Sequence, residues 1–124
     1  MNEVLIYIGS AIIIIWGIAH LVPTKAIVNG FGEISEDNKK IIMMESIAEG
    51  ITPCFLGVLV ILVTTFGNPE TQTASIVYYS VITMLLVMAL LTALTGARTS
   101  IIPYKICPIV KTLVAILIVF GIAI

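Results

Sequence analysis

The sequence has very little charge, and several familiar motifs are missing from it. Only 10% of its 124 residues are Asp, Glu, Lys or Arg, whereas a soluble domain has about 25%. Six Lys and Arg residues do not make the basic face that a nucleic-acid-binding protein needs. The single histidine cannot supply two axial ligands to a haem. Neither cysteine lies in a CxxC pair, and there is no glycine-rich phosphate loop or serine nucleophile elbow. These absences disfavour the enzyme classes that such motifs identify.

Long apolar runs dominate the chain instead, because 60% of the residues are hydrophobic. Four runs approach or exceed the roughly 20 residues needed to cross a bilayer, at about 4–22, 40–65, 74–96 and 101–124. Little chain lies between them. The sequence therefore predicts one polytopic membrane domain over residues 1–124, folded as an all-α, up-and-down bundle of four helices. The N-terminus lacks the basic region of a secretory signal, so the first run is expected to be a retained helix.

The connections between the runs indicate an orientation. All six basic residues lie in or next to the first and third connections, whereas the second connection carries only Glu70. The positive-inside rule then places the first and third connections in the cytoplasm, with both termini outside. We expect the protein to lie in the cytoplasmic membrane. Tyr78 and Tyr79 would then lie near the outer interface, as part of an aromatic belt.

The first connection also contains a helix start. Ser35 is a good N-cap, and Glu36 and Asp37 follow it where the helix dipole favours acidic residues. The second membrane helix is therefore expected to begin near Glu36. Pro23 is expected to end the first helix, and Gly30 and Gly32 mark turns between the two.

Apart from Lys40 and Lys105 near the cytoplasmic surface, the charged residues and the histidine inside the apolar runs all fall in the same half of the bilayer. At about 1.5 Å per residue, His20 lies about 5 Å inside the cytoplasmic surface, Glu45 about 7 Å, Glu49 about 13 Å and Lys111 about 15 Å. Ionisable residues at such depths are costly and usually functional. This asymmetry is the strongest functional signal in the sequence.

The polar and aromatic residues of this half also share helix faces. Side chains three, four or seven positions apart lie on one face of a helix. The residues on such stripes are Trp16 and His20 in the first run, Glu45, Glu49 and Thr52 in the second, and Tyr104, Cys107 and Lys111 in the last. Facing inward, they would enclose a polar pocket open toward the cytoplasm, near the carbonyls freed by Pro53 and Pro108.

A row of small residues in the third run indicates where helices approach closely. Ala89, Ala93 and Ala97 recur every four residues. Small residues at this spacing let the backbones of membrane helices pack together. We therefore expect this face of the third helix to pack closely against another helix.

Two ion pairs follow from the depths. Glu49 and Lys111 have opposite charges at similar depth, and the pair either serves function or only fixes the register of the helices. Glu45 and His20 also match in depth and are expected to pair, although His20 alone would suit the carboxyl end of its helix. A metal site made of His20, Glu45 and Glu49 is an alternative, because these residues offer suitable donor types.

The leading functional hypothesis is a pocket that binds a small amphipathic or lipid-like molecule of the quinone or isoprenoid type. In it, Glu45, Glu49 and His20 would act as acid–base groups in proton exchange, and the ligand contacts would include Lys111, Tyr104, Thr52 and Trp16. The alternatives are an accessory subunit of a membrane complex and a proton- or ion-coupled transporter working as an oligomer. The sequence indicates no particular cofactor.

Two fragments resemble a known family. They are GIAH at 17–20 and ESIAEGITPCFLGVLV at 45–60, and together they are similar to small four-helix membrane proteins of the DoxX-like type. Those proteins have a Gly-x-x-His-like end to the first helix and a glutamate early in the second. The resemblance covers about half the chain and implies a four-helix bundle, with some relatives tied to respiratory-chain or thiol redox chemistry. It carries over His20 and one of the two glutamates.

The expected orientation can be tested by labelling. Cysteines placed at Asn68 and at Thr24 should react with a membrane-impermeant thiol reagent from opposite sides of the membrane, because the charge bias puts their connections on opposite sides. The measurement is labelling of intact cells or right-side-out vesicles, before and after permeabilisation. Labelling of both positions from the same side would contradict the topology.

Overall fold

The computed structural model describes residues 1–124, and its helices follow the apolar runs. The elements are α1 (Glu3–Leu21), α2 (Thr24–Asn29), α3 (Glu36–Phe66), α4 (Gln72–Leu94), the 3₁₀ turn η1 (Gly96–Arg98) and α5 (Ile102–Ala123). Helices α1, α3 and α5 are long and apolar enough to cross a membrane, and so is the span that joins α4 to η1. The chain is therefore a multi-pass membrane protein, and the predicted all-α four-helix bundle is confirmed.

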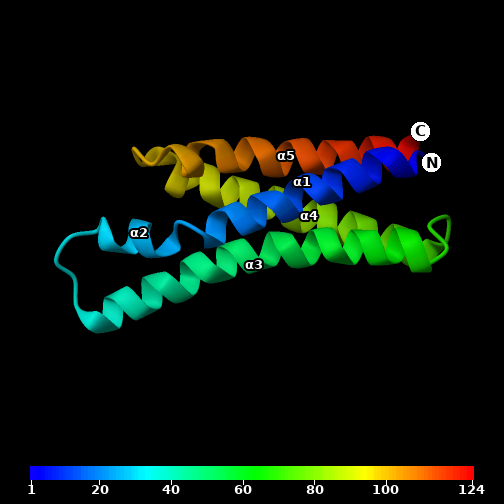
Figure 1. Ribbon diagram of the computed structural model, residues 1–124. Coiled ribbons are helices and arrows are strands. Elements are labelled where there is room, and N and C mark those ends of the chain that lie inside the picture. Colours follow the sequence, from blue (N-terminus) through cyan, green and yellow to red (C-terminus); the bar gives the residue numbers. More distant parts are fainter.

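The four long helices run up and down, as Figure 1 shows. Both termini and the α3–α4 connection lie at one end of the bundle, and α2 and η1 lie at the other. The backbone N–H of Asn2 donates to the carbonyl of Gly121 at 2.7 Å, which ties the two termini together. Helix α1 packs against α3 and α5, and α4 packs mainly against α5, whereas α3 and α4 touch little.

The first connection is more ordered than the sequence suggested. It contains the short helix α2, which was not predicted, and the start of α3 at Glu36, which was. The hydroxyl of Ser35 accepts from the N–H of Asn38 at 3.1 Å, as expected of an N-cap. Thr24 is buried and donates to the carbonyl of His20 at 3.0 Å. The exposed neighbour Lys25 is therefore the better position for a label.

The closest helix contact lies between α1 and α3, not on the alanine row of α4. A Cβ atom added to Gly17 would lie 2.6 Å from the carbonyl oxygen of Gly50 and 2.5 Å from Cys54 Sγ. Ala93, in contrast, is exposed, and Ala97 lies beyond α4 in η1. The close packing predicted for this row is therefore found at Ala89, which is buried, but not at the other two alanines.

The apolar core fills the half of the bundle nearest the termini. Its members come from all four long helices and include Ile6, Val60, Leu85 and Ile118. Tyr78 belongs to this core and is fully buried, with its hydroxyl 2.9 Å from that of Thr64. Its placement in an aromatic belt was therefore wrong, whereas Tyr79 is exposed as a belt residue would be.

The α1–α3 contact predicts a large difference between two glycine substitutions. Gly17→Ala should lower stability by about 1–3 kcal/mol, because the added methyl group meets backbone atoms that cannot move aside. Gly9→Ala on the same helix is the matched control, since its nearest neighbours would lie at 3.4 Å or more and the gain in helix propensity is the same. Thermal unfolding in detergent, followed by circular dichroism, measures both. Equal effects would contradict the contact.

Candidate intramembrane polar site

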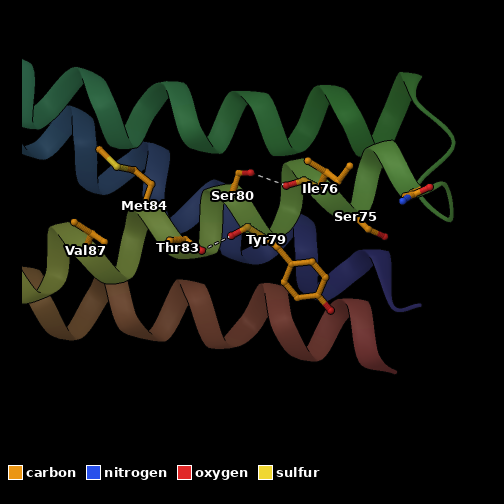
Figure 2. A pocket seen from close by; sticks show the side chains of 8 residues that line it. Ser75, Ile76, Tyr79, Ser80, Thr83, Met84 and Val87 are labelled. Atoms are coloured by element: carbon orange, nitrogen blue, oxygen red, sulfur yellow. Dashed lines mark hydrogen bonds between the residues drawn. The ribbon is translucent and has the colours of Figure 1, made fainter.

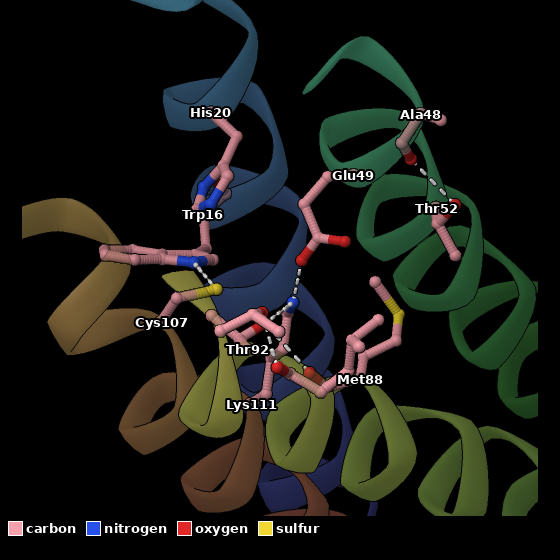
Figure 3. Close-up of polar contacts among 11 residues, drawn as sticks. Trp16, His20, Ala48, Glu49, Thr52, Met88, Thr92, Cys107 and Lys111 are labelled. Carbon is pink, nitrogen blue, oxygen red and sulfur yellow. Dashed lines mark hydrogen bonds and ion pairs between the residues drawn. The ribbon is translucent and has the colours of Figure 1, made fainter. Parts of the chain in front are cut away.

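Lys111 is the centre of the polar half of the bundle. Its side chain projects from α5 and is fully buried. The Nζ atom forms an ion pair with Oε1 of Glu49 on α3 and lies 3.4 Å from Oγ1 of Thr92 on α4. The Thr92 hydroxyl donates to the carbonyl of Met88 at 2.8 Å, so it is free to accept from Lys111. Figure 3 shows this arrangement, in which one ammonium group joins three helices.

The predicted pairing of Glu49 with Lys111 is thus present in the structure. A buried ammonium group requires a partner, because removing it from water costs several kcal/mol. Glu49 supplies a full negative charge, and its side chain stays 27% exposed. The Glu49 carboxylate therefore contacts the buried Lys111 ammonium group and is itself partly exposed.

Beside Glu49 lies a polar pocket of about 200 Å³ between α3 and α4. Glu45, Ser46 and Glu49 line it from α3, Leu91, Thr92 and Thr95 from α4, and Gly96 and Tyr104 close it at the end away from the termini. Only two of the eight lining residues are hydrophobic. The pocket lies between two helices, α3 and α4, that make few contacts with each other.

A second cluster lies on the other side of Glu49. The indole Nε1 of Trp16 donates to Cys107 Sγ at 3.4 Å, and Nδ1 of His20 lies 3.3 Å from the carbonyl oxygen of Trp16. The His20 ring also makes edge-on contacts with Trp16 and with Tyr104, at centroid distances of 5.4 and 6.0 Å. Nε2 of His20 is buried and has no hydrogen-bond partner.

The predicted pair of Glu45 and His20 is not formed. Glu45 is exposed on the rim of the pocket, and His20 lies instead beside Glu49 and Cys107. The cause is the tight α1–α3 contact: Leu21 lies directly against Gly50. Because α1 and α3 are antiparallel, this contact and that of Gly17 with Gly50 and Cys54 place His20 within one turn of Glu49 along the bundle, and further from Glu45. The only group of possible metal ligands therefore contains His20, Glu49 and Cys107 of α5, and not Glu45 as the sequence suggested.

The other predicted contacts divide between the two clusters. Tyr104 lines the pocket and Trp16 lies beside Cys107. Thr52 belongs to neither, because its hydroxyl donates to the carbonyl of Ala48 in its own helix at 2.8 Å. Thr52 follows Glu49 by three positions in α3, but it does not line the pocket.

A longer, shallow and open groove, lined by residues of α4 alone, runs along the outer face of this helix toward the termini, as shown in Figure 2. Its volume is about 630 Å³, and its lining residues run from Gln72 to Val87. The hydroxyls of Ser80 and Thr83 donate to carbonyls of their own helix, at 2.7 and 2.8 Å, so they need no other partner. Val87 is one turn before Leu91, which lines the polar pocket. The groove and the pocket thus follow one another along the same helix.

Comparisons of the chain with protein-family models, with curated proteins and with solved structures find no match. The resemblance to DoxX-like proteins therefore stays a prediction. What the site does must be argued from its own geometry.

The ion pair predicts a difference between single and double substitutions. Lys111→Met alone should lower stability by about 3–5 kcal/mol, because it leaves Glu49 without its partner, whereas Glu49→Met with Lys111→Met should be nearly neutral. Chemical unfolding in mixed micelles measures both.

The exposed pair of Lys39 and Glu36, at 3.3 Å, provides the matched control. Lys39→Met should cost less than about 1 kcal/mol, because exposed pairs contribute little. A loss at Lys111 no larger than the loss at Lys39 would mean that the inner pair is well hydrated, and would contradict its burial.

Proposed function

We propose that the protein binds a small amphipathic molecule of the quinone or isoprenoid type, with its polar head in the pocket beside Glu49 and Lys111. The observation that carries this proposal is the position of Glu49, which is paired with a fully buried lysine and also lines an open polar pocket. A pair that only fixed helix register would have no need of such a pocket. The orientation of the pocket toward the cytoplasm is part of the proposal and rests on the positive-inside rule.

The size of the pocket limits what enters it. Sites that enclose a drug-sized ligand have volumes of about 300–1,000 Å³, and this pocket has about 200 Å³. It accommodates a head group, and the rest of the ligand must lie outside it. Because the pocket opens between α3 and α4, the remainder of the molecule would extend toward the lipid.

The groove on α4 is a suitable place for an apolar tail. It begins one turn from the pocket and continues to Gln72, a distance of about 22 Å from Leu91 to Ile76 at 1.5 Å per residue. Ile76, Met84 and Val87 offer it apolar contacts. An isoprenoid or alkyl chain attached to a compact polar head matches this combination of pocket and groove.

The pocket residues suit a head group that carries carbonyl or hydroxyl oxygens. Glu49 accepts hydrogen bonds, and the hydroxyls of Thr95 and Tyr104 can donate or accept them. Glu49 is also the proposed proton acceptor, with His20 next to it. Glu45, on the rim, would connect the pocket to water. This assignment accounts for a carboxylate that is neither fully buried nor fully exposed.

Ligand retention tests the proposal. Native mass spectrometry of protein released from detergent should show one bound molecule of decyl-benzoquinone or of the C15 alcohol farnesol, whichever fits the head pocket. Glu49→Met with Lys111→Met should abolish the adduct while the bundle stays folded. The control is Glu36→Gln with Lys39→Met, which removes the exposed pair and should leave the adduct unchanged. Adducts of equal abundance in both double variants would overturn the proposal and favour an accessory role for the inner pair.

A further inference from the structure

Three side chains of types that can bind a metal ion lie close together in the bundle, each from a different helix. A ring nitrogen of His20 on α1, a carboxylate oxygen of Glu49 on α3 and Cys107 Sγ on α5 all lie within 4.8 Å of one another. Cys107 is fully buried, Glu49 is partly buried, and the Nε2 atom of the partly buried His20 is itself buried. Residues 20, 49 and 107 are far apart in the sequence, so the arrangement is produced by the packing of the bundle.

The orientation of His20 is that of a metal ligand. With Nδ1 as the N–H donor to the carbonyl of Trp16, at 3.3 Å, the other nitrogen carries a lone pair. That nitrogen, Nε2, is buried and has no partner in the protein. Histidines that bind metal ions almost always donate their second ring N–H to a carbonyl or carboxylate, which fixes the tautomer. Nε2 is therefore a buried acceptor, and the Cys107 thiol beside the ring is the group that could donate to it in the absence of a metal ion.

The surroundings of Cys107 also suit a metal ligand. A thiolate is the form that binds metal, and the Trp16 indole N–H already donates to Sγ at 3.4 Å. Trp16 therefore contacts both candidate ligands: its carbonyl oxygen holds His20, and its indole holds Cys107. It would act as the outer support that orients the ligands, as such partners do in known metal sites. Figure 3 shows Trp16 and His20 above Cys107, with Glu49 opposite them.

We propose that His20, Glu49 and Cys107 bind a divalent transition-metal ion, with Zn²⁺ as the best match. One imidazole, one carboxylate and one thiolate are all ligand types that zinc accepts, at about 2.0–2.3 Å. Tetrahedral geometry at these bond lengths puts donors about 3.3–3.8 Å apart, so the cluster must contract by about 1 Å. Three protein ligands leave one position open, as in catalytic zinc sites.

Lys111 is compatible with the ion and supplies a test. A carboxylate has about four lone-pair sites, so Glu49 can hold Lys111 and a metal ion together. The charges of Glu49 and of a Cys107 thiolate balance a divalent ion, and Lys111 then adds an unbalanced positive charge nearby. Repulsion between the two cations weakens metal binding. Replacing Lys111 with methionine should therefore tighten metal binding, whereas the proposed lipid-like ligand should be lost.

Cobalt binding to the full-length protein, with any tag removed, tests the site. One equivalent of Co²⁺ should produce a thiolate-to-cobalt charge-transfer band and intense tetrahedral d–d bands, and one equivalent of Zn²⁺ should abolish both. Cys107→Ser and Glu49→Gln should each weaken binding at least about tenfold, a loss comparable to that from changing an outer-shell partner. The matched controls, Cys54→Ser and Glu36→Gln, should leave the spectrum unchanged. No charge-transfer band in the wild type, or a full band in Cys107→Ser, would overturn the proposal.

A second measurement needs no variant. His20 is the only histidine in the chain, so its ring nitrogens can be followed by ¹⁵N NMR in the wild-type protein. One equivalent of Zn²⁺ should shift the Nε2 resonance and leave Nδ1 protonated. Unchanged ring resonances would exclude His20 as a ligand and overturn the proposal. If the Lys111→Met variant binds the metal ion but not the amphipathic ligand, the two sites are separate. If the wild-type protein binds the amphipathic ligand but no metal ion, the metal site is overturned and the proposed function stands.

Discussion

The burial of the Lys111 ammonium group is the constraint on which the polar half of the bundle depends. An ammonium group in this apolar interior requires acceptors, and it finds Glu49 on α3 and Thr92 on α4. The Lys111 side chain of α5 therefore fixes the positions of α3 and α4 along the bundle axis. Glu49 is only partly buried, and the polar pocket lies beside it between α3 and α4. The buried Lys111 charge and the opening between α3 and α4 thus lie next to each other, on either side of the Glu49 carboxylate.

The second constraint is the close approach of α1 and α3 at Gly17 and Gly50. It brings His20 level with Glu49, so that this carboxylate belongs to two clusters. On one side Glu49 meets Lys111 and the pocket; on the other it meets His20 and Cys107. The two proposals use the same carboxylate but different partners, which is why substitutions of Lys111 separate them.

Much of this could be predicted from the sequence, because run length and depth are one-dimensional properties. Four apolar runs gave the spans, Ser35 marked the start of α3, and residue counts placed Glu49 level with Lys111. Lateral neighbours could not be obtained in this way. Glu45 and Glu49 share a helix face one turn apart, and only the packing of Gly17 on Gly50 decides which of them meets His20. Cys107 was on a polar stripe, but ligands from three separate helices have no sequence spacing that identifies them. Helix α2 has only six residues, too few to produce a periodic pattern.

The most direct test of this account is the distance between Lys111 Nζ and the Glu49 carboxyl carbon in a lipid bilayer. Solid-state NMR of protein labelled with ¹⁵N-lysine and ¹³C-glutamate can measure the dipolar coupling between the two atoms. The account predicts a strong coupling that persists in the Lys39→Met variant, where the only other lysine–glutamate pair is removed, and disappears in Lys111→Met. If all of the coupling is lost with Lys39 and none with Lys111, the buried ion pair does not exist in the membrane, and the proposed head-group pocket loses its basis.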